Sequence, residues 1–442
     1  MDNLKTKLAD YILLREEGQN IILFNQYNDA TVKITADLYK KIKKGYLKDT
    51  EENKKIIYIL HQNRLLDWEQ SYTSTSEKPQ QSQQRTFYSP IMRLRSEINP
   101  INVLWAITSK CNLRCLYCFP DVKNVQQAFI SLSLEEIDQI TDQIIQSQAL
   151  QVFISGGEPL LEAEKVWRII EKLYKHNVKS GVLNNGTMIN AGIIEKLKSY
   201  NTIVGISLDA HNEEINSITR GKGAFDKTVK GVKLLKQADI RTSVLITLSK
   251  YNFDSLEAHI KFLCDDMGIN SIVIQDLRPF GSKIDYDKAR LTMTQENKLY
   301  DKVMKITNRY SNVDFNLTEL FLFPHSKYKT KKSGKIMQCP AGYNFAYIDF
   351  YGDMYPCTQL PTMKLGNVLQ DGTITELWRS SKNMQKLRTL KTESICKIDG
   401  CADCSLNEFC DGGCRGEAVF SGRGLYGSAS RCPKVMGIDI KI

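Results

Sequence analysis

The sequence predicts an α/β protein: a partial (β/α)6 barrel of the TIM type, with a small winged-helix-like module before it and a cysteine-rich domain after it. Three observations support this fold class. Six apolar, strand-like segments alternate with helical segments between Asn102 and Ile274. A stretch rich in Ser, Gln and Thr precedes them at residues 69–90, and eight of the twelve cysteines follow Pro324.

Composition indicates a protein of several folded domains whose cysteines bind a metal or a cluster. With 442 residues, 42% hydrophobic content and a net charge of +10, the chain is long and apolar enough for several folded domains. No stretch approaches the roughly 20 apolar residues that a membrane helix needs, so we expect a cytoplasmic protein without a membrane partner. In that reducing compartment, twelve cysteines predict metal or cluster ligation rather than disulfide bonds.

The first expected domain is the winged-helix-like module, residues 1–67. Alternating and helical apolar patterns predict a hairpin with its turn at 17–19, a strand at 31–35, and helices at 36–44 and 50–63. Residues 68–92 are expected to form a flexible linker, because they contain few aliphatic side chains to bury.

The barrel is assigned to residues 93–323 and the cysteine-rich domain to residues 324–442. The regular spacing of the apolar segments predicts a parallel sheet, whose functional site lies at the carboxyl ends of the strands. The expected strands are 103–107, 152–155, 181–183, 204–208, 242–247 and 271–274. Two further short strands are expected at 345–349 and 354–356, on either side of Gly352.

Directly after the first barrel strand, Cys111, Cys115 and Cys118 follow the spacing C-x3-C-x2-C. Three thiols on one loop leave one iron of a 4Fe–4S cube without a protein ligand, whereas a structural zinc site normally closes all four positions. The missing fourth thiol therefore indicates a place for a reactant. A partial zinc site is the alternative for these three cysteines taken alone.

This spacing resembles that of the radical S-adenosylmethionine (SAM) superfamily, and later motifs agree with it. They are SGGEP at 155–159, NNGT at 184–187, GISLDA at 205–210 and TRGKGAF at 219–225. The resemblance implies that Cys111, Cys115 and Cys118 hold a SAM-binding 4Fe–4S cluster. One-electron reduction of the bound SAM would then yield a 5'-deoxyadenosyl radical.

The same resemblance implies the residues that contact SAM. Gly156, Gly157 and Glu158 would serve the methionine amino group, and Arg220 would pair with the methionine carboxylate. Ser207 and Asp209 would serve the ribose side, and the ring of Tyr117 would lie on the cofactor base. Asn185, in the NNGT motif, completes the expected SAM contacts.

The later cysteines resemble those of the SPASM extension of peptide-modifying radical SAM enzymes, in spacing, order and the intervening Gly352. By that resemblance, Cys339, Cys357 and Cys414 would hold one auxiliary 4Fe–4S cluster with an open iron. The other auxiliary cluster would be held by Cys401, Cys404, Cys410 and Cys432, which makes three clusters in all. Cys396 is an alternative fourth ligand for the open cluster, and a double zinc ribbon is the alternative for the whole domain.

These resemblances imply a peptide maturase. The front module would capture the leader of a ribosomally made precursor peptide, and flavodoxin or ferredoxin would donate electrons. The expected product is a thioether, formed by a cysteine thiolate held on the open auxiliary iron. Carbon–carbon crosslinking is an alternative, as is formylglycine formation, although Thr358 replaces the aspartate usual in the sulfatase-maturing branch. From another class, the protein would be a zinc-stabilised regulator that binds nucleic acid, a partner that we do not expect.

Overall fold

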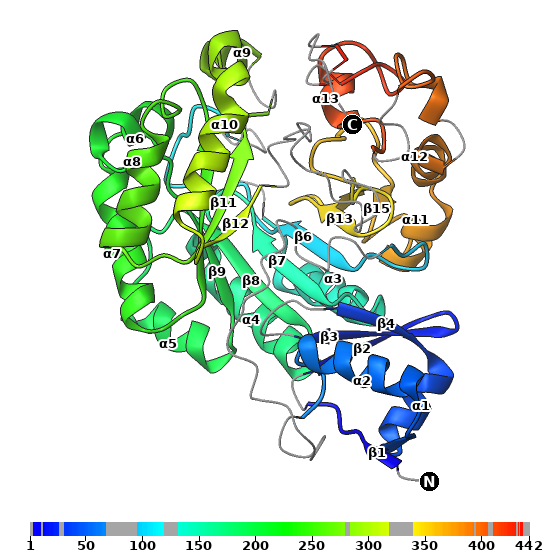
Figure 1. Ribbon diagram of the computed structural model, residues 1–442. Helices are drawn as coiled ribbons and strands as arrows, with labels where there is room; N and C mark the ends of the chain where they lie inside the picture. The colour runs from blue at the N-terminus through cyan, green and yellow to red at the C-terminus, as the bar shows by residue number, and fades with distance from the viewer. Residues whose placement is uncertain are drawn as a thin grey trace.

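A computed structural model gives the architecture of the chain (Figure 1). It describes residues 3–9, 12–25, 31–67, 95–118, 131–278, 283–317, 339–392, 395–404, 410–429, 432 and 434–435. The expected linker, residues 68–92, lies outside these ranges, so the linker and the domain boundaries stay predictions.

A ten-stranded sheet forms the centre of the molecule. Strands β6 to β12 lie side by side in chain order, and each neighbouring pair is parallel. The six predicted barrel strands are confirmed within two residues at each end: β6 (Asn102–Ala106), β7 (Gln151–Ser155), β8 (Lys179–Asn184), β9 (Ile203–Ser207), β10 (Thr242–Leu248) and β11 (Ser271–Asp276). A further parallel strand, β12 (Asp314–Asn316), was not predicted, because three residues, two of them polar, show no strand pattern.

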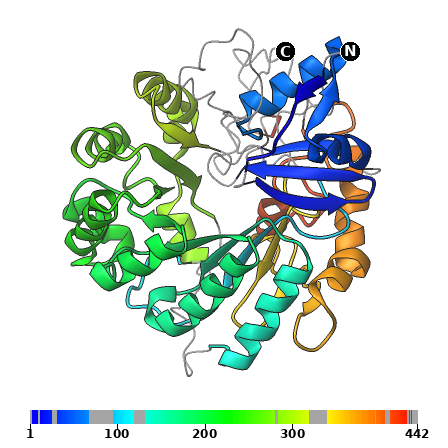
Figure 2. The same ribbon diagram turned by 90° about the horizontal axis from the view of Figure 1, so that it is seen from below.

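Helices cover the outer face of the curved sheet (Figure 2). In β6, the buried cluster shared with the helices contains Val103 and Trp105, whereas Leu104 and Ala106 belong to a cluster on the other face. This alternation follows from the two-residue period of a strand. The helices are α3 (Leu134–Gln146), η2 (Pro159–Glu162), α4 (Ala163–Lys175), α5 (Ala191–Ser199), α6 (Glu213–Arg220), α7 (Ala224–Gln237), α8 (Leu256–Lys261), η3 (Phe262–Asp266), α9 (Lys283–Ala289) and α10 (Met293–Arg309). Among the described helices, none is long and apolar enough to cross a membrane.

The cysteine-rich domain continues the barrel sheet. Strand β13 (Phe345–Ile348) pairs in parallel with β6, and β14 (Asp353–Tyr355) and β15 (Gly366–Asn367) follow it in antiparallel order. Both short strands predicted around Gly352 are confirmed, and Gly352 takes the positive φ of +81° that their turn requires. The remaining helices are α11 (Ile374–Ser380), α12 (Lys382–Thr392), η5 (Ile395–Lys397) and α13 (Arg415–Phe420).

The described part of the N-terminal module contains two small sheets and two helices. Strands β2 (Ile12–Glu17), β3 (Asn20–Asn25) and β4 (Thr31–Thr35) form an antiparallel sheet, and β1 (Asn3–Lys5) pairs with β5 (Tyr46–Lys48). The predicted hairpin, the third strand and both helices, α1 (Ala36–Lys43) and α2 (Glu51–Gln62), are confirmed. Thr35 and Thr50 cap these helices, which is why each begins where it does.

This module is docked on the barrel beside the amino ends of its strands. Arg15 is buried and donates hydrogen bonds to the carbonyls of Pro100 (2.8 Å), Asn99 (2.8 Å) and Gln148 (3.3 Å). Apolar side chains from both parts form one buried cluster, namely Leu13, Ile22, Phe24, Ile101 and Leu150. The module therefore lies at the end of the barrel opposite to the strand ends that carry the motifs (Figure 1).

Candidate cofactor-binding site

The cysteine loop, residues 107–118, follows the carboxyl end of β6. Cys111, Cys115 and Cys118 are half-buried on this loop. Burial raises the pKa of the Cys111 thiol to about 11, and the nearby thiols of Cys115 and Cys118 add to the rise. The structure thus brings the three predicted ligands together at one strand end.

The glycines of the second motif pack against this loop. The N–H of Gly157 donates to the carbonyl of Thr108 (2.8 Å), and the N–H of Glu158 donates to the carbonyl of Lys110 (2.6 Å). A Cβ atom at Gly156 would overlap the Thr108 carbonyl, and one at Gly157 would overlap the Lys110 carbonyl. Both positions require glycine because two backbones meet here, a contact that the sequence did not reveal.

Glu158 joins two strand ends. Its carboxylate is fully buried and accepts hydrogen bonds from the N–H groups of Leu160 (3.0 Å) and Asn185 (2.8 Å). Burial raises the pKa of this carboxyl to about 7, although both hydrogen bonds oppose the rise. Glu158 therefore fixes the loop after β7 to the loop after β8, and its predicted contact with SAM stays a prediction.

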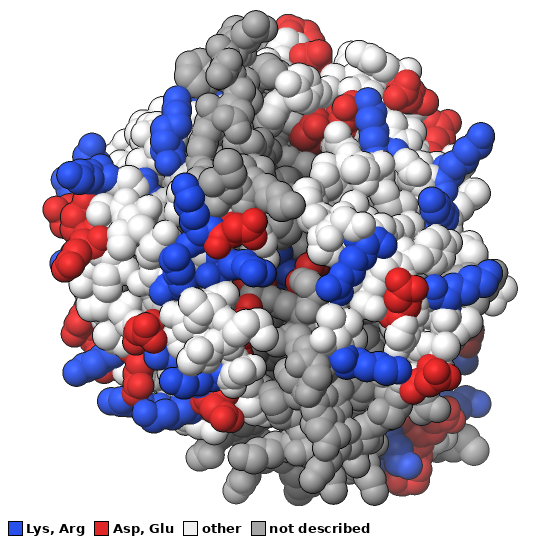
Figure 3. Space-filling model, turned by 90° about the horizontal axis from the view of Figure 1, so that it is seen from above, with Lys and Arg blue, Asp and Glu red and all other residues white. Residues whose placement is uncertain are grey.

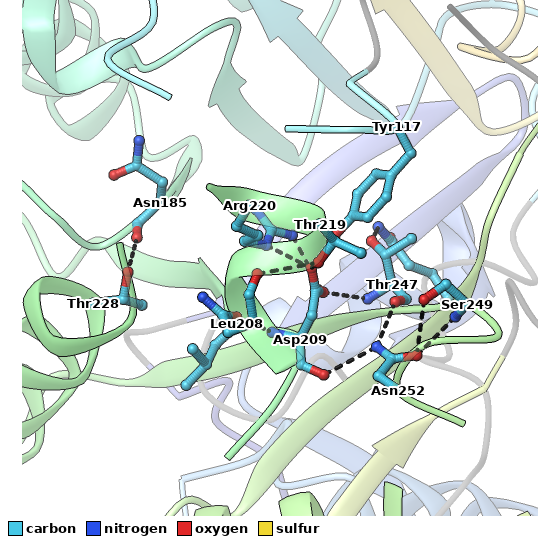
Figure 4. A network of polar contacts seen from close by, with 12 residues as sticks. Tyr117, Asn185, Leu208, Asp209, Thr219, Arg220, Thr228, Thr247, Ser249 and Asn252 are labelled. Carbon is cyan, nitrogen blue, oxygen red and sulfur yellow. Dashed lines mark hydrogen bonds and ion pairs between the residues drawn. The ribbon is translucent and has the colours of Figure 1, made fainter. Parts of the chain in front are cut away.

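Asn185 connects the third strand end to the cysteine loop. Its Nδ2 donates to Oδ1 of Asn112 (2.7 Å), and Nδ2 of Asn112 donates to Oγ1 of Thr187 (2.8 Å). Thr228 donates to the carbonyl of Asn185 (2.8 Å; Figure 4). Asn112 was missed by the sequence analysis, although its place directly after Cys111 was the available signal.

Asp209 is the centre of a buried polar network at the end of β9 (Figure 4). Its carboxylate accepts hydrogen bonds from Nε of Arg220 (2.7 Å), from Oγ1 of Thr219 (3.1 Å) and from the N–H of Thr247 (2.9 Å). The hydroxyl of Tyr117 donates to the same carboxylate. These partners come from the cysteine loop, α6 and β10, so one carboxylate connects three elements around the site.

By family resemblance, Tyr117, Asp209 and Arg220 were expected to contact separate parts of SAM. The structure joins them to one another, with the Arg220 guanidinium 5.6 Å from the centre of the Tyr117 ring. Burial lowers the pKa of Arg220, but the Asp209 carboxylate together with the nearby Tyr117 and Cys115 outweighs this effect and raises that pKa above its ordinary value. Ser207, at the end of β9, is half-buried, and its hydroxyl makes no hydrogen bond with any described residue. The predicted SAM contacts of all four residues stay predictions.

The later cysteines gather in two groups. In the first, the Cys414 thiol donates to Oε1 of Gln359 (3.2 Å), and the N–H of Gln359 donates to the sulfur of Cys357 (3.4 Å). Burial raises the pKa of Cys414 to about 11, while Arg278 lowers it and the nearby Cys339 thiol raises it. Gln359 and Arg278 are neighbours of this group that the cysteine spacing did not indicate.

In the second group, burial raises the pKa of the Cys401 thiol, and the nearby thiols of Cys432 and Cys404 add to it. Burial likewise raises the pKa of Cys410 to about 11, with a contribution from Cys401. These groups contain residues of the two ligand sets expected for the auxiliary clusters, and their binding of clusters stays a prediction. Cys396 is exposed on the short helix η5.

Comparison with known proteins identifies the two regions. Residues 105–263 match the radical SAM superfamily, and residues 339–405 match the SPASM iron–sulfur cluster-binding domain. The chain is a radical SAM enzyme with a SPASM domain. It is 29% identical to mycofactocin maturase MftC of Mycolicibacterium smegmatis, over 80% of this chain and 88% of MftC.

Two further relatives extend the comparison of the radical SAM/SPASM enzyme. AlbA of Bacillus subtilis, an antilisterial bacteriocin subtilosin biosynthesis protein, is 26% identical over 70% of this chain and 67% of AlbA. The crystal structure of Streptococcus suis SuiB bound to its precursor peptide SuiA has a TM-score of 0.68 at 16% identity. That alignment covers 97% of this chain and 99% of SuiB, which shows a shared fold.

Radical SAM and SPASM domains imply 4Fe–4S clusters with SAM. The cysteines at both sites are free thiols, and thiolates are the ligands that such clusters take, so the residues present fit these cofactors.

The face above the strand ends carries both signs of charge. Figure 3 shows Lys and Arg side chains interspersed with Asp and Glu side chains on either side of its centre.

Proposed function

We propose that this enzyme modifies a ribosomally made precursor peptide and forms thioether bonds between a cysteine sulfur and a carbon of the peptide. The relatives support a peptide as the substrate class. MftC is a maturase, AlbA serves the biosynthesis of the bacteriocin subtilosin, and SuiB has been solved with a precursor peptide bound.

The observation that carries the thioether proposal is the group of Cys339, Cys357 and Cys414. Gln359 joins two of these cysteines, and the group contains one cysteine fewer than the four irons of a cube require. Cys396, the remaining candidate, is exposed at the surface. An iron without a cysteine from this chain suits the binding of a substrate thiolate.

At the radical site, the proposed role of this chain's residues is to bind the cluster and SAM and to orient them. We propose that Cys111, Cys115 and Cys118 hold the cluster to which SAM binds, against the glycines of the second strand end. When bound, SAM and its cluster would supply a 5'-deoxyadenosyl radical that takes one hydrogen atom from a carbon of the peptide; the substrate thiol would lose its proton on forming the C–S bond, and the remaining electron would leave through the auxiliary clusters. The Asp209 network holds Arg220 beside Tyr117 of the cysteine loop, and Ser207 lies at the end of β9.

The N-terminal module is the proposed site for the leader of the peptide. Strand β4 is an edge of its three-stranded sheet among the described residues, since β3 pairs with it on one side only. An extended peptide adds to such an edge through main-chain hydrogen bonds. The opposite edge strand, β2, carries Arg15, whose side chain is occupied with the barrel.

The test is the mass of a cysteine-containing precursor peptide before and after thiol alkylation. The peptide is incubated anaerobically with the enzyme, SAM and reduced flavodoxin or ferredoxin, the proposed electron donors. Each thioether removes one S–H and one C–H hydrogen, so we expect a loss of two hydrogens and one alkylatable thiol per bond.

The enzyme with Cys111, Cys115 and Cys118 replaced by alanine is the control, and we expect it to leave both SAM and peptide unchanged. Loss of two hydrogens with every thiol still alkylated would replace the thioether proposal by carbon–carbon crosslinking. SAM cleavage by the triple variant would contradict the assignment of the radical site.

A further inference from the structure

Arg415 is the first residue of α13 and directly follows Cys414. Four residues before Cys414 lies Cys410, which belongs to the other cysteine group. The turn between them contains Gly412 and Gly413, with positive φ of +83° and +75°. Because of this turn, two cysteines that are close in sequence belong to two different cysteine groups. The fully buried side chain of Arg415 packs beneath the turn.

Three carbonyls hold the end of this guanidinium. Nη1 of Arg415 donates to the carbonyls of Leu425 (2.9 Å) and Gly427 (2.8 Å), and Nη2 donates to the carbonyl of Gly412. The remaining nitrogen, Nε, is buried and has no hydrogen-bond acceptor among the described residues. A buried N–H of a charged group is costly to leave unpaired, so Nε is free to donate to an acceptor outside the described residues.

Cysteines of both groups surround this charge. Burial lowers the pKa of Arg415, whereas the thiols of Cys414, Cys401, Cys339 and Cys410 each raise it. Two of these four cysteines belong to each group. A hydrogen bond also connects the two groups: Asp411, in the turn that follows Cys410, accepts from the N–H of Cys339 (3.2 Å).

We propose that Arg415 is a positive charge shared by the two auxiliary clusters, with its Nε–H donating to a cluster sulfur. The inference rests on the two ligand sets proposed above and not on the chemistry performed on the peptide. Reduction adds one negative charge to a cluster, so a buried cation and an N–H···S hydrogen bond favour the reduced form. One residue that acts on both clusters raises both reduction potentials together. It therefore changes the difference between the two potentials less than it changes either potential.

The experiment measures the reduction potentials of the auxiliary clusters by EPR-monitored titration. The parent protein has Cys111, Cys115 and Cys118 replaced by alanine, so that only the auxiliary clusters respond. We expect Arg415→Gln to lower both potentials, each by at least a tenfold change in the reduction equilibrium, about 59 mV for one electron. Arg415→Lys keeps the charge but loses the planar donors, so we expect a smaller decrease at both clusters.

Arg423→Gln is the matched control, because Arg423 is an exposed arginine of the same segment that donates to the carbonyl of Ser428. Unchanged potentials in Arg415→Gln, with the iron and sulfide content of the parent, would overturn the proposal. A decrease at one cluster alone would overturn the shared role. If the glutamine variant does not retain its clusters, the lysine variant is the test. Reduction potentials equal to those of the parent at both clusters of Arg415→Lys would then overturn the proposal. A parent with less iron than two clusters require would instead contradict the ligand sets.

Discussion

Replacing Arg15 by methionine tests how the N-terminal module is held on the barrel. Arg15 donates to three carbonyls of the barrel, to Oγ of Ser96 (3.1 Å) and to the carboxylate of Glu17 (3.2 Å). Both members of the Arg15–Glu17 pair are buried, with side-chain exposures of 1% and 7%. Methionine matches the length of the apolar stem but supplies neither the charge nor the donors.

The expected cost follows from the carboxylate left behind. Removing one partner of a buried ion pair costs about 3–5 kcal/mol, because the other charge stays buried without compensation. At about 1.4 kcal/mol per factor of ten, the equilibrium for opening the docked module rises by roughly two to three and a half powers of ten. Opening also exposes Leu13, Ile22 and Phe24, whose burial depends on Ile101 and Leu150 of the barrel.

Hydrogen–deuterium exchange resolved by peptide measures this opening locally. We expect faster exchange in β2 and β3 of Arg15→Met and unchanged exchange in α7, which lies on the far side of the barrel from the module (Figure 1). Arg15→Met combined with Glu17→Gln leaves no unpaired carboxylate, so its exchange is expected to lie closer to that of the wild type. Wild-type exchange rates in β2 and β3 of the single variant would refute the assigned role of Arg15.

Three further changes test the site and its surroundings. Gly157→Ala forces a Cβ against the Lys110 carbonyl, so we expect this variant to lose SAM binding, measured by calorimetry. The control, Gly192→Ala, has room for its Cβ and is expected to bind SAM normally. Equal SAM binding by both variants would contradict the assigned role of the Gly157 contact. Asp209→Asn is expected to cost about 3–5 kcal/mol, because its arginine partner keeps a buried charge, and an unchanged melting temperature would rule this out. Burial lowers the pKa of His259 to about 4, so between that pH and its ordinary value the unfolded chain binds the proton and the folded chain does not. Stability is therefore lost on acidification, by about 2 kcal/mol at pH 5, and an equally steep loss in His259→Gln would count against this account.

The sequence by itself determined the positions of most strands and helices and indicated the candidate cluster ligands. Strand and helix positions follow from local periodicity, which is why six barrel strands were located within two residues and why the hairpin around Gly352 was recognised. The cysteine spacings are also local, so they indicated three ligand sets before any fold was known. The loop after each parallel strand was correctly expected at one edge of the sheet, because parallel strands share their carboxyl ends.

Only the tertiary structure decided which of these residues touch. Tyr117 and Asp209 are separated by 92 residues, and Arg15 lies 85 residues from Pro100, so their contacts leave no trace in local spacing. Tyr117 and Arg220, which were expected to contact separate parts of SAM, both bind Asp209, since a buried carboxylate is stable only where several donors converge on it. Arg415 illustrates the same point: its sequence position beside Cys414 is plain, but its place between two cysteine groups depends on a turn and on chain segments that meet only after folding.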